Sequence, residues 1–162
     1  MKIRMSIITA FAFIILFGLS AQGQVVNDTA NQTSIFPKGT RAPAGSFTGA
    51  VWLQPLHTDD SLFHCVMSNV TFEPGARTFW HKHPAGQILL ITSGICYYQE
   101  RGKSIQVFHK GDVVKSPPGV ENWHGASPDS MMAHIAVNPN AEKGVVTWLQ
   151  PVTDDEYKGI KK

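Results

Sequence analysis

The sequence predicts a single all-β domain, built as an antiparallel sandwich or barrel. Its 162 residues suit one domain. Short runs rich in β-branched and aromatic residues recur along most of the chain, and Gly and Pro separate them. No long stretch shows a helical period, and strands at such short, regular spacing are typical of sandwiches and barrels.

The first 23 residues have the pattern of a secretory signal. Lys2 and Arg4 precede an apolar run, IITAFAFIILFGL, that is short for a membrane span. Ala21 and Gly23 then supply the small residues that a signal peptidase reads. An uncleaved membrane anchor is the alternative, although no stop-transfer pattern follows. We expect a secreted or periplasmic protein with no membrane contact after signal cleavage.

Three further segments follow the signal. Residues 24–46 are polar and rich in Gly, Pro, Thr and Asn, which indicates a flexible arm. Strand-like runs then fill residues 47–152 and predict the barrel. Residues 153–162 form a C-terminal tail that contains a helix-like run, with Thr153 as the expected N-cap. The arm and the terminal strands leave unpaired edges, so we expect a homodimer that covers them.

The charge balance argues against nucleic acid as a partner. The chain has 14 Lys and Arg and 12 Asp and Glu. Signal cleavage removes Lys2, Arg4 and no acidic residue, so the formal charge of the remainder is zero. Nothing resembles a basic nucleic-acid-binding surface, and we expect a small-molecule substrate as the partner.

Cys65 and Cys96 leave two alternatives open. An oxidising compartment permits a disulfide between them. Both lie in strand-like runs, however, where separate burial is the usual fate of a cysteine. Nothing in their spacing demands a bridge.

The stretch HKHPAGQ contains candidate metal ligands. Alternate residues of a strand share a face, so His81 and His83 point the same way. Gln87 follows the turn at Pro84-Ala85-Gly86, begins the next strand and can face the histidines. Imidazole suits Mn, Fe, Zn and Ni. Taken alone, an H-x-H pair fits an exposed or core pair as well as a metal site.

The residues around this pair resemble the two sequence motifs of the cupin superfamily. The matching residues are Gly75, His81, His83, Gln87 (where the first motif has Glu) and Gly94, followed by Gly111, Pro117, Pro118, Gly119 and Asn122 of the second motif. The resemblance covers residues 47–152. It implies a double-stranded β-helix, or jelly-roll barrel, with one divalent metal ion near its mouth.

Two longer patterns are similar to the small manganese cupins that act as (R)-mandelonitrile lyases and to cupins allied to carboxymuconolactone decarboxylases. They are VTFEPGART-WH-HP-GQ and GDVV…PPG…WHGA…MAHIA. In that subgroup a glutamine at the position of Gln87 is normal. The resemblance implies manganese as the cofactor, with Fe, Zn or Ni as alternatives. Two imidazoles and an amide leave the charge of the cation uncompensated, which makes it a stronger Lewis acid.

Asn122 stands where cupins have a histidine ligand. Three interpretations stay open: Asn122 coordinates through its amide oxygen, water fills the position, or metal binding is lost. His124 lies two residues further on the same face, about 6.6 Å along a strand. It therefore reaches the same position only if a bulge shifts the strand.

A pocket is expected around the second pair of histidines. The match at HIA places one face of MMAHIAVN inside the barrel, and by alternation Ser68, Val70 and Phe72 line the opposite wall. The inward face consists of Met132, His134, Ala136 and Asn138. The outward Trp80 and Trp123 are expected to serve packing. Three other histidines, His57, His64 and His109, carry no functional expectation.

These residues lead to a hypothesis of a metal-dependent lyase that acts on a small hydroxyl- or carbonyl-bearing molecule. His124 would act as the general base, and His134 would stabilise the departing anion. A dioxygenase that uses Fe and O₂ is one alternative. A non-catalytic cupin that binds a small ligand is the other.

Overall fold

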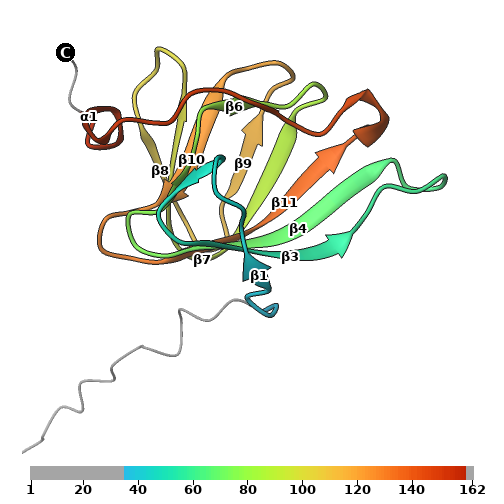
Figure 1. The fold of residues 1–162 in the computed structure, drawn as a ribbon, viewed down its shortest axis with the longest axis horizontal. Helices are drawn as coiled ribbons and strands as arrows, with labels where there is room; N and C mark the ends of the chain where they lie inside the picture. The colour runs from blue at the N-terminus through green and yellow to red at the C-terminus, as the bar shows by residue number, and fades with distance from the viewer. Residues whose placement is uncertain (1–34, 160–162) are drawn as a thin grey trace, which may run out of the picture.

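The computed structural model describes residues 35–159, and most of the regular structure in this range is β-strand (Figure 1). The strands are β1 (Thr40–Arg41), β2 (Phe47–Thr48), β3 (Val51–His57), β4 (Cys65–Phe72), β5 (Arg77–Thr78), β6 (His81–Lys82), β7 (Gln87–Glu100), β8 (Gln106–His109), β9 (Val113–Ser116), β10 (Asn122–Ala126), β11 (Met132–Pro139) and β12 (Thr147–Trp148). Two short helices complete the described part: the 3-10 helix η2 (Ala141–Lys143) and the α-helix α1 (Asp154–Tyr157). The predicted all-β class is confirmed.

The strands form one curled antiparallel sheet. Its main path runs β1-β3-β4-β11-β7-β10-β5-β2, while β8 and β9 pair with β7, and β6 pairs with β10 and β12. Figure 1 shows that the curl brings one half of the sheet over the other. This arrangement is the barrel that the sequence predicts.

The long strand β7 belongs to both halves of the sheet. Its first half pairs with β9 and β11, and its second half pairs with β8 and β10. Gly94 lies at the change of partner with φ of 70°. An added Cβ there would lie 1.7 Å from the carbonyl oxygen of Met131. The bend that joins the two halves therefore requires glycine.

The main core lies between the two halves. Successive residues of β7 alternate between buried and more accessible positions, as expected when one face of a strand packs inward. Phe72, Leu89, Tyr98 and Met132 are among the largest buried side chains of this core. Val70, Phe72 and Ala136 belong to the core and also line the cavity described below.

A second, smaller core lies under the C-terminal tail. Trp80, Trp123, Val152 and Tyr157 pack together there, which confirms that the two tryptophans serve packing. The Tyr157 hydroxyl donates to the carbonyl oxygen of Ala126 at 2.7 Å. As expected, the N-cap of α1 is Thr153, which forms a capping box with Glu156.

The described end of the predicted arm is tied to the barrel. Thr40 and Arg41 pair with β3, and the side chain of Asn69 donates to the carbonyl oxygen of Pro37. The predicted signal, residues 1–23, and residues 24–34 of the arm lie outside the described residues. No helix within residues 35–159 is long and apolar enough to cross a membrane. Export and assembly as a homodimer stay predictions.

The two cysteines are not bridged. Cys96 is fully buried in the main core, and Cys65 is partly buried at the start of β4. Of the two alternatives, the structure has separate burial. Burial raises the pKa of the Cys96 thiol to about 12, so this side chain behaves as a small apolar core residue.

We expect Gly94→Ala to destabilise the protein strongly. The added methyl group meets the Met131 backbone and also requires a left-handed conformation, so the free energy of unfolding should fall by roughly 3 kcal/mol or more. Gly102→Ala is the matched control, because Gly102 has φ of 80° but open space around its Cβ position. It should cost only about 1 kcal/mol. Urea unfolding measures both values, and equal losses would contradict this account of Gly94.

Candidate active site

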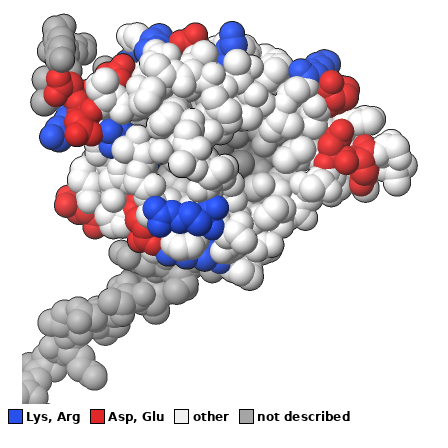
Figure 2. Space-filling view, viewed as in Figure 1, with Lys and Arg blue, Asp and Glu red and all other residues white. Residues whose placement is uncertain are grey.

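A cavity of about 310 Å³ opens between the two halves of the sheet. This volume is in the range of small-ligand pockets. Its wall is mostly apolar and aromatic and also contains polar side chains. The polar lining residues are Ser46, Ser68, Thr78, His81, His83, Gln87, His124, His134 and Asn138. Figure 2 shows that charged side chains lie mainly around the periphery of the molecule in this view, whereas the hollowed centre is largely uncharged.

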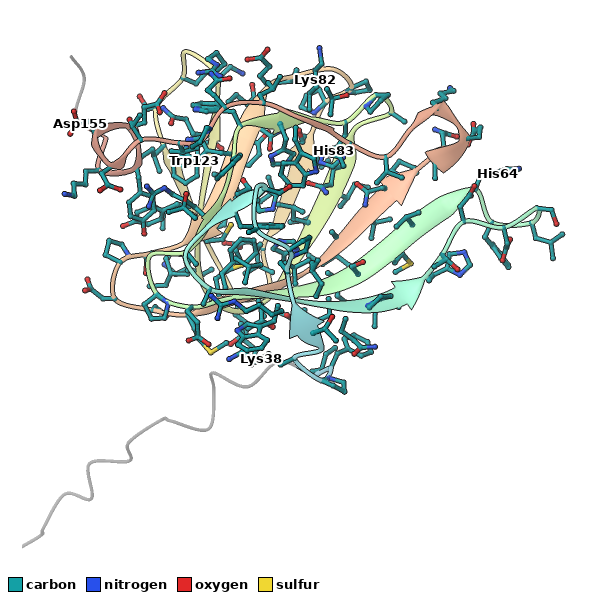
Figure 3. All side chains as sticks on the ribbon, in the orientation of Figure 1. Lys38, His64, Lys82, His83, Trp123 and Asp155 are labelled. Carbon is teal, nitrogen blue, oxygen red and sulfur yellow. The ribbon has the colours of Figure 1, made fainter. Side chains whose placement is uncertain are left out.

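His81 and His83 come from β6 and the residue that follows it. Their rings lie 5.0 Å apart, centroid to centroid, and both line the cavity, so the predicted shared face is confirmed. Figure 3 shows His83 beside β6, whereas His64 lies well away from it, at the far end of β4. None of His57, His64 and His109 lines the cavity.

Backbone carbonyl groups hold both rings by Nδ1. His81 Nδ1 lies 2.9 Å from the carbonyl oxygen of Phe79, and His83 Nδ1 lies 2.6 Å from that of Val145. A carbonyl oxygen can only accept, so each Nδ1 carries the proton and donates. Each Nε2 is therefore left with a free lone pair. His83 Nε2 is buried and has no hydrogen-bond partner.

The amide of Gln87 is also anchored through its N–H group, which leaves its oxygen atom without a partner. Its Nε2 donates to Oδ1 of Asn138 at 3.0 Å, and Nδ2 of Asn138 donates to the carbonyl oxygen of Val66 at 3.4 Å. Oε1 of Gln87 is buried without a partner. Asn138 thus lines the cavity, as predicted, and also orients the Gln87 amide.

Asn122 lies next to His81 in the sheet but does not line the cavity. The two residues are paired across β10 and β6. Its Nδ2 donates to Oγ of Ser116 at 2.9 Å and to the carbonyl oxygen of Val120 at 3.2 Å. Its Oδ1 is buried and has no partner. The residue of β10 that faces the open cavity is His124.

His124 and His134 form a second pair of imidazoles. Their ring centroids lie 5.0 Å apart, and the ring of Phe72 packs against both. Nδ1 of His124 and both ring nitrogens of His134 are buried without partners. The backbone N–H of His124 is held by Oγ1 of Thr78 at 3.1 Å.

Burial keeps these imidazoles neutral near pH 7. Loss of hydration is the main cause that lowers the pKa of His81 to about 3 and that of His134 to about 3. The pKa of His124 is lowered well below its usual value, first by burial and then by the neighbouring histidines. Burial also lowers the pKa of His83, and the Val145 carbonyl opposes that shift. Neutral imidazoles can accept protons or bind metal ions.

The unpartnered atoms fit a metal ion only if amides take part. Among residues 35–159, no three His, Cys, Asp or Glu side chains converge to hold a metal ion. Two imidazole nitrogens and two amide oxygens are nevertheless available, from His81, His83, Gln87 and Asn122. Each of these side chains is fixed through its other polar atom. Such a mixed set suits a divalent cation that accepts oxygen ligands.

The predicted pocket residues divide into two groups. Ser68, Val70, Phe72 and Asn138 line the cavity together with His124 and His134. Met132 does not line the cavity. It is fully buried in the main core, where it is paired across the sheet with Phe72 of β4 and Gly94 of β7.

The sequence reasoning missed one part of the cavity wall. Phe47 of β2 and Trp148 of β12 meet there with ring centroids 5.4 Å apart, and Trp148 also packs on His81 at 5.0 Å. Val145 and Val146 complete this wall. Each of β2 and β12 has only two residues, so alternation gave no signal there. Aromatic residues in both terminal segments were the available hint.

No family model matches this sequence, but individual proteins are similar to it. The chain is 42% identical over 118 residues to a protein named (R)-mandelonitrile lyase from Granulicella tundricola, covering 73% of this chain and 90% of that protein. The crystal structure of a cupin-like protein from Thermotoga maritima is 46% identical, with a TM-score of 0.76 over 78% of this chain and 96% of that one. A putative acetylacetone dioxygenase from Methylibium petroleiphilum shares the fold alone, at 15% identity and a TM-score of 0.54 over 70% and 78% of the two chains.

The buried histidines predict a specific pH dependence of stability for the metal-free protein. Above pH 6.5 His134 is neutral in both the folded and unfolded states and contributes nothing. Below that pH the unfolded state binds a proton that the folded state refuses until about pH 3. His134 should therefore lower the free energy of unfolding by about 1.4 kcal/mol for each pH unit between these limits.

His134→Phe should remove this contribution, so its stability falls less steeply with decreasing pH than that of the unchanged protein. His109→Gln, which replaces an exposed histidine, is the control and should keep the original slope. Urea unfolding between pH 7 and pH 4 measures the slopes. Parallel curves for His134→Phe and the unchanged protein would contradict the burial account.

Proposed function

Because the chain belongs to the cupin superfamily, we propose that it is a metal-dependent lyase that acts on a small hydroxyl- or carbonyl-bearing molecule, in the manner of a hydroxynitrile lyase. One observation carries this proposal. His83, Gln87 and Asn122 each have one polar atom anchored and one buried without a partner, beside a pair of neutral imidazoles in an apolar cavity. His81 adds an Nε2 lone pair, because its Nδ1 donates to the carbonyl oxygen of Phe79. Anchored ligands and unprotonated bases are what such a reaction needs.

His81 and His83 would hold the cation through Nε2, and Gln87 and Asn122 would hold it through their amide oxygens. None of these ligands carries a negative charge. The chemistry that a bound divalent cation supplies is Lewis acidity toward a hydroxyl or carbonyl oxygen, and neutral ligands leave it undiminished. Two oxygen donors favour manganese, with Fe, Zn or Ni as alternatives.

His124 would act as the general base. Its low pKa keeps it unprotonated, and it faces the cavity. In cleavage of a hydroxynitrile, His124 takes the hydroxyl proton, the oxygen forms the carbonyl double bond, and the carbon–carbon bond breaks. The electron pair of that bond leaves with cyanide.

His134 would receive the departing anion. Its two ring nitrogens have no protein partner, so the N–H of the neutral ring is free to donate to cyanide. Phe72, Val70 and Ala136 surround the pair with apolar groups. Their exclusion of water strengthens such hydrogen bonds and favours a small apolar or aryl group on the substrate.

The metal proposal predicts opposite effects for two substitutions. His81→Ala should abolish binding of Mn²⁺, because it removes a nitrogen ligand. Asn122→His should tighten binding, because it restores the histidine of the cupin motif. Metal analysis after loading and dialysis measures both, with His109→Gln as the control that keeps full occupancy. Weaker binding by Asn122→His would show that Asn122 is not at the ligand position.

The catalytic proposal predicts cyanide release from mandelonitrile by the Mn²⁺-loaded protein. His124→Ala should slow this release by roughly 10²–10⁴-fold, as for loss of a positioned general base. Its metal content should stay unchanged. Release that survives both metal removal and loss of His124 would overturn the assignment. Substrate-dependent oxygen uptake in place of cyanide release would indicate the dioxygenase alternative.

A further inference from the structure

The amide of Asn122 is oriented by its surroundings rather than by chance. The side chain is fully buried, so its polar atoms depend on protein partners. The carbonyl oxygen of Val120 can only accept a hydrogen bond, so the atom that faces it at 3.2 Å must be Nδ2. This contact identifies the nitrogen of the amide, so Oδ1 lies on its other side.

Ser116 binds the second N–H of the same amide. Its Oγ accepts from Nδ2 of Asn122 at 2.9 Å, the shorter of the two contacts. Ser116 is itself buried at the end of β9, where it is paired with Gln87 of β7. A single serine thus lies next to one proposed amide ligand and holds the other.

Donation by both N–H groups also changes the amide oxygen. Hydrogen bonds polarise one another, and an amide whose N–H groups donate carries more negative charge on its oxygen. That oxygen, Oδ1 of Asn122, is buried without a partner. It would therefore be a better metal ligand than the oxygen of an unanchored asparagine. Because the side chain is already fixed, metal binding also costs less conformational entropy.

We propose that Ser116 is a positioning residue of the metal centre, which holds the amide of Asn122 so that Oδ1 is presented as a ligand. The inference rests on the metal site of the proposed function. It adds a reason why asparagine can serve where the cupin motif has histidine. An amide oxygen binds a metal ion less strongly than an imidazole nitrogen does. The hydrogen bond from Nδ2 of Asn122 to the hydroxyl oxygen of Ser116 offsets part of this difference.

The test uses the full chain without its signal and Mn²⁺ alone as the probe. Ser116→Ala should weaken Mn²⁺ binding by roughly 10–100-fold in calorimetric titration, which is the usual effect of losing a partner of a ligand. In the metal-free protein, the side-chain N–H signals of Asn122 should exchange faster with water in Ser116→Ala. Those signals are assigned by their loss in Asn122→Ala. Ser127→Ala, another buried serine just beyond the far end of β10, is the matched control and should change neither measurement.

A double-substitution cycle separates positioning from general damage to the fold. In Asn122→Ala, the further change Ser116→Ala should alter Mn²⁺ affinity by less than about twofold, because the amide it positions is gone. An equal loss in both backgrounds would overturn the proposal, as would an unchanged affinity in Ser116→Ala. Failure of the metal site itself would look different, since the unchanged protein would then bind Mn²⁺ no better than His81→Ala.

Discussion

Placing polar side chains inside a barrel requires that their hydrogen-bonding groups find partners, and the site depends on how this constraint is met. The backbone carbonyl groups of Phe79 and Val145 accept hydrogen bonds from Nδ1–H of His81 and His83. The side chains of Asn138 and Ser116 accept hydrogen bonds from the amide N–H groups of Gln87 and Asn122. In each case the donor is satisfied, and the acceptors of His83, Gln87 and Asn122 are buried without partners. Free acceptors buried in one region are costly unless something binds them, which is why they indicate a ligand site.

The barrel brings these partners together from distant parts of the chain. Val145, which holds His83, lies after β11 and η2, and Val66, which holds Asn138, lies near the start of β4. The bend of β7 at Gly94 makes this possible, because one strand then belongs to both halves of the sheet. Loss of that bend would separate the wall that carries Gln87 from the wall that carries His124.

The chemistry of the cavity follows from its mostly apolar lining. The wall is mostly apolar, so the imidazoles of His124 and His134 stay neutral without charged neighbours to balance them. The contact of Phe47 with Trp148 adds aromatic side chains to the cavity wall from segments far apart in the chain. An apolar chamber with neutral bases and uncharged ligand atoms suits reactions in which charge develops only in the transition state.

The sequence by itself determined the all-β class and the shared face of His81 and His83, because motif spacing and two-residue alternation are local properties. The resemblance at HIA placed His134 inward, and alternation then placed Val70 on the facing wall. Only the tertiary structure decided that His124 lines the cavity while Asn122 turns its amide to Ser116, since both residues share one strand face. It also decided that Met132 is core and that Trp148 lines the cavity. Hydrogen-bond partners and cavity walls come from contacts between segments far apart in the chain, and these leave no period in the sequence.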